Sequence, residues 1–245
     1  MDPDRVVIAT TTLYGSLEEV RAKLALSTIE KAIENGFQII VVDSSNDEIR
    51  HSFSMRGAKV LKGTSSGMGI NRRYAIREAK QLAGENGVIV WTEPEKAPLI
   101  PLLPDIITHL ESADMVIPKR KSLKSYPIVQ QHSEWLGNRD FLTITGLDLD
   151  VFFGPRIFRA DASSFFLSYK GEYGDEWDSI FIPVLRAIKA GELVIGVEVN
   201  YTHPKEQTRE EERLEKQFSA KRIRQLVSLI HALRKESQIL GLNLS

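Results

Sequence analysis

The stretch from Gly87 to Lys96, GVIVWTEPEK, constrains the fold more than any other part of the sequence. Its apolar residues, Val88 to Trp91, are β-branched or aromatic and follow one another without alternation, which is typical of a strand buried on both faces of a parallel sheet. Ligands of open α/β sheets bind outside the carboxyl ends of the strands. Glu93 and Glu95, directly after this strand, are therefore placed to hold a cation or a polar ligand, and the alternative is a pair of solvated loop acids.

Two earlier segments repeat this pattern of an apolar run with a polar end. Residues 6–9 form a short apolar run followed by Thr10 and Thr11, and residues 37–42 form a second run that ends at Asp43. Asp43 begins an Asp-Ser-Ser-Asn-Asp cluster and is suited either to a ligand or to an Asx turn. We expect the polar ends of these strands to line one cleft.

A helix is expected between the first two strands. Ser16 and Glu19 have the spacing of a capping box, which predicts a helix over roughly residues 17–35. Strand, helix and strand with short connections form a βαβ unit. The sequence therefore predicts an α/β fold, with a mostly parallel central sheet and helices on both of its faces.

A glycine-rich loop at residues 63–69 precedes a helix expected from about residue 70 to residue 83. Backbone amides at such a loop and helix start favour anions, so the loop either faces a diphosphate or serves as a flexible connection. It lacks the Gly-Lys-Ser/Thr of a Walker loop and the third glycine of the dinucleotide-binding fingerprint.

Two later segments carry weaker signals. The basic run KRKSLK at residues 119–124 is expected to be a solvated loop, with a cationic wall for a phosphate-bearing ligand as the alternative. Residues 130–150 are polar and aromatic without a clear period, and we expect them to contribute to a substrate pocket.

Residues 205–245 are expected to form a C-terminal helical extension. A charge-rich run at 205–216 is followed by an amphipathic pattern. We expect this helix to pack on its own domain or on a second copy of the chain in a homo-oligomer, rather than on a membrane. The apolar face predicted for it consists of Phe218, Ile223, Leu226, Val227, Ile230 and Leu233.

The composition excludes several classes of protein. With 245 residues, 42% hydrophobic and 27% charged, the chain fits one globular domain with at most a small appendage. A formal net charge of −1 argues against nucleic-acid binding by phosphate neutralisation, and the lack of cysteine excludes disulfides and thiolate metal sites. The acidic amino terminus is unlike a signal peptide, and no apolar stretch reaches ~18 residues, so we expect a soluble, cytoplasmic protein without a transmembrane segment.

The order of these features resembles a family-2-type glycosyltransferase of the GT-A fold over about residues 5–204. Two motifs differ in detail from the family pattern: Asp43-Ser-Ser-Asn-Asp47 stands where the family has Asp-Asp-Gly-Ser-x-Asp, and Glu93-Pro94-Glu95 stands where the family has Asp-x-Asp. The other features that carry the resemblance are the polar end of the first strand, Gly67-x-Gly69-x-Asn71-Arg72-Arg73, Gly154-Pro155-Arg156 with Phe158-Arg159, and Gly174-Asp175-Glu176-x-Asp178.

The resemblance implies a GT-A-like three-layer fold, with residues 1–204 as the nucleotide-sugar transferase domain and residues 205–245 packed on it. It implies an enzyme that moves a sugar from a nucleoside-diphosphate sugar to an acceptor hydroxyl, assisted by a divalent cation, Mn²⁺ or Mg²⁺. The alternatives are a non-catalytic nucleotide- or sugar-binding domain and a nucleotidyltransferase. A nucleotidyltransferase would require a glycine-rich, basic loop after the first strand, and residues 10–15 are neither glycine-rich nor basic.

The resemblance also implies roles for individual residues. The acids proposed to accept the proton of the acceptor hydroxyl are Glu176, Asp178 and Asp175, whose alternative role is to cap the helix that follows. If Arg72 and Arg73 do not bind a ligand, the alternative is that they are solvated residues on a helix face. The alternative for His203 is a hydrogen-bonded structural histidine. The nucleotide-binding residues implied are Thr10, Thr11, Asp43, Gly69, Asn71, Arg72 and Arg73, and the metal ligands implied are Glu93, Glu95 and His203.

Overall fold

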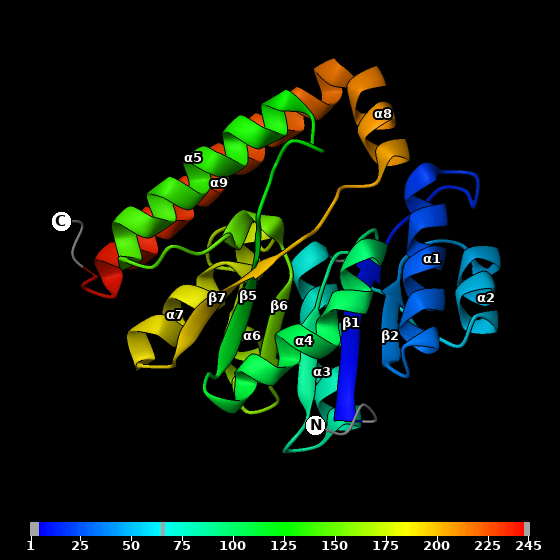
Figure 1. Ribbon diagram of the computed structural model, residues 1–245, viewed down its shortest axis with the longest axis horizontal. Helices are drawn as coiled ribbons and strands as arrows, with labels where there is room; N and C mark the ends of the chain where they lie inside the picture. The colour runs from blue at the N-terminus through cyan, green and yellow to red at the C-terminus, as the bar shows by residue number, and fades with distance from the viewer. Residues whose placement is uncertain (1–4, 65–66, 243–245) are drawn as a thin grey trace.

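The computed structural model describes residues 5–64 and 67–242 and, within them, a seven-stranded sheet in the order β3-β2-β1-β4-β6-β5-β7 (Figure 1). β6 runs antiparallel to its neighbours β4 and β5, and the other neighbouring pairs are parallel. The mostly parallel sheet predicted from the sequence is therefore confirmed. The strands are β1 (Val6–Thr12), β2 (Gln38–Asp43), β3 (Lys59–Lys62), β4 (Val88–Trp91), β5 (Met115–Arg120), β6 (Arg156–Arg159) and β7 (Val194–Val199).

β4 is an interior strand, as its continuous apolar run predicts. It pairs with β1 on one side and β6 on the other, and all four of its residues are buried. Trp91 lies opposite Ala9 in β1, and Thr12 lies opposite Asp43 in β2. The polar ends of β1, β2 and β4 therefore meet at one edge of the sheet.

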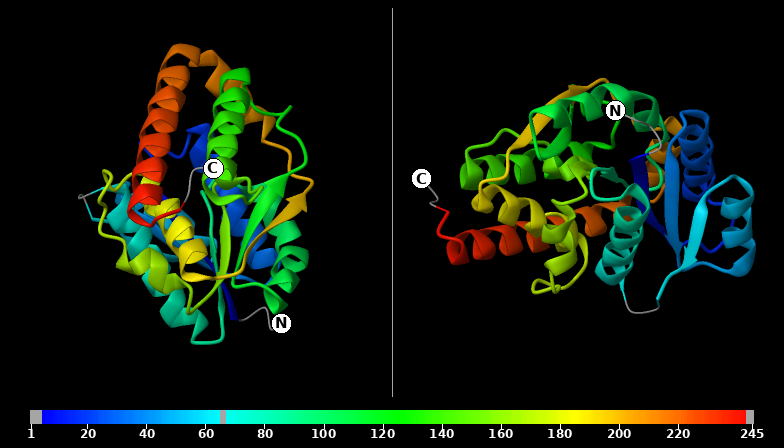
Figure 2. Two further views of the ribbon diagram at one scale, coloured as in Figure 1. Left: turned by 90° about the vertical axis from the view of Figure 1, so that its left-hand side faces the viewer. Right: turned by 90° about the horizontal axis from the view of Figure 1, so that it is seen from below.

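Helices cover both faces of the sheet and give three layers (Figures 1 and 2). Val7 and Ala9 of β1 enter a hydrophobic cluster with α3, α6, α7 and α9, whereas Val6 and Ile8 enter a second cluster with α1, α2 and α4. This alternation follows from the two-residue period of a strand. The helices are α1 (Val20–Glu34), α2 (Asp47–Met55), α3 (Met68–Ala83), α4 (Leu103–Thr108), α5 (Ile128–Thr145), α6 (Ser163–Ser168), α7 (Ile182–Ala190), α8 (Lys205–Arg213) and α9 (Glu215–Ile239), with short 3₁₀ helices η2 (Ala97–Leu102), η3 (His109–Glu111), η4 (Val151–Phe153) and η5 (Trp177–Ile180).

Helix α1 begins at Val20, three residues later than the capping-box pattern predicts. The Glu19 carboxylate does bend back, and accepts hydrogen bonds from the backbone N–H groups of Gly15 and Ser16 at 2.7 and 3.1 Å. The Ser16 hydroxyl accepts instead from the N–H of Glu18 at 3.0 Å. These bonds close a turn ahead of the helix. The capping-box pattern therefore predicted a helix correctly but placed its first residue too early.

The segment without a clear period, residues 130–150, proves to be largely helical. Residues up to Thr145 belong to α5, and η4 begins at Val151. Gln130, Glu134 and Asp140 are polar yet buried on the inner side of α5. The sequence of α5 therefore lacks the continuous apolar stripe by which an amphipathic helix is recognised. The helix was missed because its buried face mixes polar residues with apolar ones such as Phe141 and Ile144.

Helix α9 runs alongside α5, and both stand at one end of the sheet (Figures 1 and 2). Leu229 and Leu233 enter the core, whereas Ile223 and Val227 of the predicted apolar face are 56% and 63% exposed. The buried line instead follows Phe218, Leu229 and Leu233, since α9 is oriented by α5, α7 and η5 together. The predicted face is therefore partly wrong.

Across residues 5–64 and 67–242, no helix is both long enough and apolar enough to cross a membrane.

Candidate functional site

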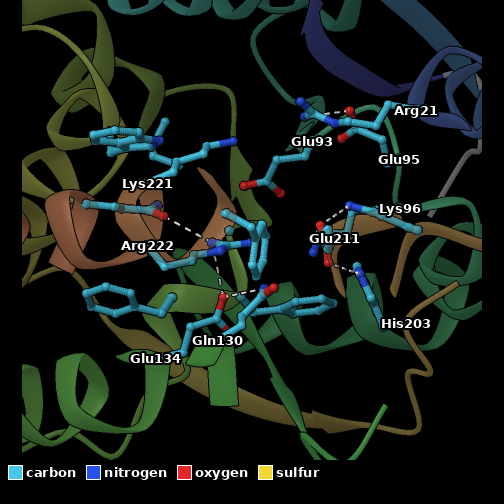
Figure 3. A pocket seen from close by; sticks show the side chains of 18 of the residues that line it. Arg21, Glu93, Glu95, Lys96, Gln130, Glu134, His203, Glu211, Lys221 and Arg222 are labelled. Carbon is cyan, nitrogen blue, oxygen red and sulfur yellow. Dashed lines mark hydrogen bonds and ion pairs between the residues drawn. The ribbon is translucent and has the colours of Figure 1, made fainter. Parts of the chain in front are cut away.

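A cavity of about 380 Å³ lies at the carboxyl end of β4, between the sheet and helices α8 and α9 (Figure 3). This volume is within the range of small-molecule sites. Residues from both sides of the boundary expected at residue 204 line it, so the C-terminal helices form a wall of the pocket. Its ionisable lining residues are Arg21, Arg72, Glu93, Glu95, Lys96, Glu134, His203, Glu210, Glu211, Lys221 and Arg222, and its aromatic lining residues are Phe152, Phe153, Trp177, Phe181 and Phe218.

Glu95 is 4% exposed and already has two partners. Arg21 of α1 forms an ion pair with its Oε1 atom at 2.7 Å, and the Tyr14 hydroxyl donates to the same atom at 3.0 Å. Glu95 raises the pKa of Arg21, and burial followed by Glu95 raises the pKa of Tyr14. The Oε1 atom of Glu95 is thus occupied by protein groups rather than free for a ligand.

Glu93 points into the cavity (Figure 3). Its Oε2 atom is buried, and no hydrogen-bond partner for it exists in the part of the chain that the structure describes. Gly154, at φ +106°, allows this approach, because a Cβ at that position would overlap the Glu93 carboxylate. Burial lowers the pKa of both Arg72 and Arg156 to about 10, and the nearby charge of Glu93 opposes that effect at each.

The three predicted metal ligands do not fit a divalent cation. His203 contacts Glu211, with 3.2 Å between Nε2 and Oε2, and Glu95 is neutralised by Arg21. Nowhere in residues 5–64 and 67–242 do three His, Cys, Asp or Glu side chains gather as a metal-binding group. Oxygen-rich cation sites need several free carboxylate oxygens, and the Oε1 atom of Glu95 is already occupied by Arg21 and Tyr14. The divalent cation therefore stays a prediction from the resemblance.

His203 is nine-tenths or more buried and stacks on Tyr126, with 4.1 Å between the ring centroids. Burial lowers its pKa, although Glu211 acts in the opposite direction. Its Nδ1 atom is buried and has no partner among the described residues. These contacts agree with the structural alternative for this histidine.

Asp43 is fully buried at the end of β2. It accepts hydrogen bonds from the Thr12 hydroxyl at 2.6 Å and from the N–H and hydroxyl of Ser45 at 2.9 and 2.7 Å. This is the Asx-turn arrangement that the sequence left open. Thr10 is 1% exposed and lies beneath α1, which leaves Thr11 as the more accessible of the two predicted threonines.

Arg72 and its neighbours on α3 face different ways. Arg72 lines the pocket and donates to the backbone oxygen of Glu176 at 2.8 Å and to the Ser179 hydroxyl at 3.1 Å. Arg73 forms a bidentate ion pair with Asp175 instead. Asn71 ties the ends of β2 and β3 together through Ser44 and residue 64.

Gly69 donates its N–H to the backbone oxygen of Asp175 at 2.8 Å and has no space for a Cβ against that residue. Its missing side chain thus serves packing between α3 and the 171–178 loop. Residues 65 and 66 of the predicted glycine-rich loop lie outside the described residues.

The three predicted catalytic acids have different surroundings. Asp178 is buried and accepts from the Tyr169 hydroxyl and from the N–H groups of residues 175 and 176, so it organises the loop. Asp175 is paired with Arg73. Glu176 is exposed, and its carboxylate makes no hydrogen bond within residues 5–64 and 67–242.

The basic run at 119–124 is not all solvated. Lys119 and Arg120 complete β5, and Arg120 is buried in ion pairs of 2.7 Å with Glu134 and Asp150. Burial acts to lower the pKa of Arg120, but the two carboxylates outweigh it and raise the pKa. The prediction of a solvated loop is wrong for Arg120, because its partners come from α5 and the turn before η4.

Three cationic pocket residues were not among the predicted site residues. Lys96 follows the acid pair, and Lys221 and Arg222 belong to a helix that the sequence placed outside the site. Their only signal was basic charge on an amphipathic helix, which is the ordinary state of a solvated helix face.

No protein-family model and no curated protein matches the sequence. Solved structures do resemble it. Mannosyl-3-phosphoglycerate synthase from Rubrobacter xylanophilus has a TM-score of 0.61 at 16% identity, covering 95% of this chain and 75% of that protein. A structure assigned as a nucleotide-diphospho-sugar transferase from Desulfovibrio desulfuricans G20 has a TM-score of 0.51 at 11% identity, covering 88% and 98%.

The chain therefore shares the fold of these two structures. A third structure with this arrangement is Rv0371c from Mycobacterium tuberculosis H37Rv, with a TM-score of 0.51 at 14% identity over 83% of this chain and 92% of that one. Identities this low show a shared fold alone. Membership of glycosyltransferase family 2 is not confirmed by these comparisons.

Proposed function

We propose that the chain is a glycosyltransferase, which binds a nucleoside-diphosphate sugar in the pocket at the end of β4 and transfers the sugar to an acceptor hydroxyl. The observation that carries the proposal is the position of the pocket in this fold. It lies outside the carboxyl end of a central parallel strand, where ligands of open α/β sheets bind, and charged and aromatic side chains line it.

The residues divide into three roles in this proposal. Aromatic side chains such as Trp177 and Phe152 provide flat apolar surface for the sugar, while Arg72 and Lys96 supply positive charge for the phosphates. A base must accept the proton of the acceptor hydroxyl. Of the three predicted acids we assign this role to Glu176, because Asp178 is occupied by hydrogen bonds within its loop and Asp175 by Arg73.

A divalent cation, when bound, would neutralise charge on the diphosphate leaving group. Glu93 has an oxygen without a partner among the described residues, whereas the Oε1 atom of Glu95 would first have to release Arg21.

The test is calorimetric titration of the full chain with UDP, GDP, CDP and their common sugar conjugates, followed by a product assay with the conjugate that binds. Binding of a nucleotide sugar together with acceptor-dependent release of the nucleoside diphosphate is expected. Binding without turnover over a broad acceptor panel would indicate a non-catalytic domain, and release of pyrophosphate from a nucleoside triphosphate would indicate a nucleotidyltransferase.

A further inference from the structure

We propose that Lys96 is an anion-binding residue of the pocket that contacts a phosphoryl group of the ligand directly, without a metal ion between them. The inference deepens the proposed function and rests on it only for the molecule that carries the phosphoryl group.

Lys96 is a buried cation without an anionic partner. The residue is 9% exposed, and its Nζ atom lies over the rings of Phe153, Tyr201 and Tyr126, at 4.5, 5.4 and 5.8 Å from their centroids. In the described part of the chain its ammonium group makes no ion pair and no hydrogen bond. The rings attract the ammonium group through their negative faces but leave its N–H donors unused. Because Lys96 lines the cavity, these donors are available to a ligand.

Three of the five carboxylates that line the pocket are paired with other residues, and neither of the other two, Glu93 and Glu210, forms an ion pair with Lys96 in the described residues. Glu95 is paired with Arg21, Glu134 with Arg120, and Glu211 with His203. A buried charge is costly unless it is paired, so a cation left without a carboxylate in a cavity is the expected complement of an anionic ligand. The aromatic rings reduce that cost in the free protein without occupying the position of the anion.

Two further cations approach the same cavity from other elements. Arg72 comes from α3, and its Nε atom is buried without a partner among the described residues. Lys221 comes from α9, and its side chain points into the cavity although the residue as a whole is exposed (Figure 3). Burial of its ammonium group, with Arg21 and Arg222 nearby, lowers the pKa of Lys221 to about 8. Cations from three separate elements suit an anion of more than one charge.

A phosphoryl group has this chemistry, since it carries between one and two negative charges near neutral pH and offers three strong acceptor oxygens. It can come from the diphosphate of a nucleotide sugar or from a phosphorylated acceptor. Direct contact with the protein cations is consistent with the poor fit of Glu93, Glu95 and His203 to a metal ion.

The experiment titrates the full chain with pyrophosphate by calorimetry in excess EDTA, comparing the parent with Lys96→Met. Methionine retains an apolar stem among the three rings and removes the charge. Loss of one charge-assisted contact is expected to weaken pyrophosphate binding about 10- to 100-fold. Lys235→Met is the matched control, because Lys235 is exposed on α9, does not line the cavity and undergoes the same change. Binding that requires Mn²⁺, or that Lys96→Met leaves unchanged, overturns the inference.

Two further arms separate this inference from the proposed function. If nucleoside diphosphates bind and Lys96→Met has no effect, the inference fails while the proposed function stands. If pyrophosphate binds through Lys96 but no nucleotide sugar binds, the inference stands and the proposed function fails. Inorganic phosphate titrated with and without saturating nucleoside diphosphate identifies the source, since competition assigns the site to the donor and simultaneous binding assigns it to an acceptor.

A second variant keeps the inference testable if Lys96→Met does not fold. Lys221→Met alters an exposed helix position, so its folding is expected to be preserved. It should weaken pyrophosphate binding in EDTA by several-fold, and unchanged affinity in this variant would contradict the inference.

Discussion

Polar residues follow the strands in two neighbouring regions of the sheet edge, and the two regions treat them in opposite ways. Over β1 and β2, Asp43 is closed in hydrogen bonds with Thr12 and Ser45, and both of its oxygens are used by the protein. At the end of β4, Lys96 and Glu93 reach a cavity and keep unpaired polar atoms. A polar residue at a strand end is thus a structural group or a ligand-facing group according to whether its hydrogen bonds are completed within the protein.

This contrast predicts different consequences of substitution. Residues of the closed region should affect mainly the free energy of unfolding, because removing one partner leaves buried donors or acceptors without a bond. Residues of the open region should affect mainly ligand binding.

The largest change in stability is expected for Asp43→Ala. It leaves the Thr12 hydroxyl and both donors of Ser45 without their acceptor, so the free energy of unfolding should fall by about 2–3 kcal/mol in urea denaturation. Asp47→Ala is the matched control, since its side chain is 97% exposed and its ion pair with Arg50 should contribute less than about 1 kcal/mol. Equal effects of the two substitutions would contradict the distinction between the regions.

A smaller loss of stability is expected for Glu95→Gln, which lies at the border of the two regions. The substitution weakens the contacts with Arg21 and Tyr14, and we expect a loss of about 1–2 kcal/mol because Glu95 is buried although Arg21 is 45% exposed. Glu210→Gln, which alters a pocket acid without an ion pair in the described chain, should stay within about 0.5 kcal/mol. If Glu95→Gln does not lower the free energy of unfolding, Glu95 belongs with the ligand-facing residues and its assignment to the border is wrong.

Glu93→Gln separates direct binding of phosphate from binding through a metal. If the cations bind phosphate directly, removal of a nearby negative charge should strengthen pyrophosphate binding in EDTA by about 1 kcal/mol, or roughly fivefold. If Glu93 holds a divalent ion, the same substitution should abolish Mn²⁺-dependent binding. Calorimetry with EDTA and with Mn²⁺ distinguishes these results.

The smallest effect is expected in the pH dependence of binding. Because the pKa of Lys221 is lowered to about 8, its ammonium group is present at pH 7 and largely lost at pH 9.5, so nucleoside-diphosphate affinity should fall by a few-fold as the pH rises through 8. The groups that act on it are Arg21 from α1, Glu95 after β4, Glu211 from α8 and Arg222 on α9. Lys221→Met should remove this part of the profile.

Protein stability should respond to the same titration with the opposite sign. Between pH 8 and the ordinary lysine pKa of 10.5, the unfolded chain binds more protons at this position than the folded chain does. The contribution of Lys221 to the free energy of unfolding should therefore rise as the pH rises through that window, while anion binding weakens. A parallel loss of both in the parent, absent from Lys221→Met, would contradict the assigned pKa.

The sequence by itself determined the α/β class, the interior position of β4 in a mostly parallel sheet and the edge of the sheet at which a site forms. Hydrophobic continuity and polar strand ends are local properties, so they can be read without knowing what packs where. The buried strand at residues 88–91 and the acid pair that follows it show this most directly.

Only the tertiary structure decided which polar residues face a ligand. Asp43 and Lys96 both follow strands, but one is closed by Thr12 and Ser45 while the other is enclosed by aromatic rings from three distant segments. The wall formed by α9 and the pairing of Arg120 with Glu134 likewise depend on contacts between segments far apart in the chain. Such contacts leave no periodic signal, because a charged side chain has the same letter in the sequence whether its partner is water, a carboxylate or a substrate.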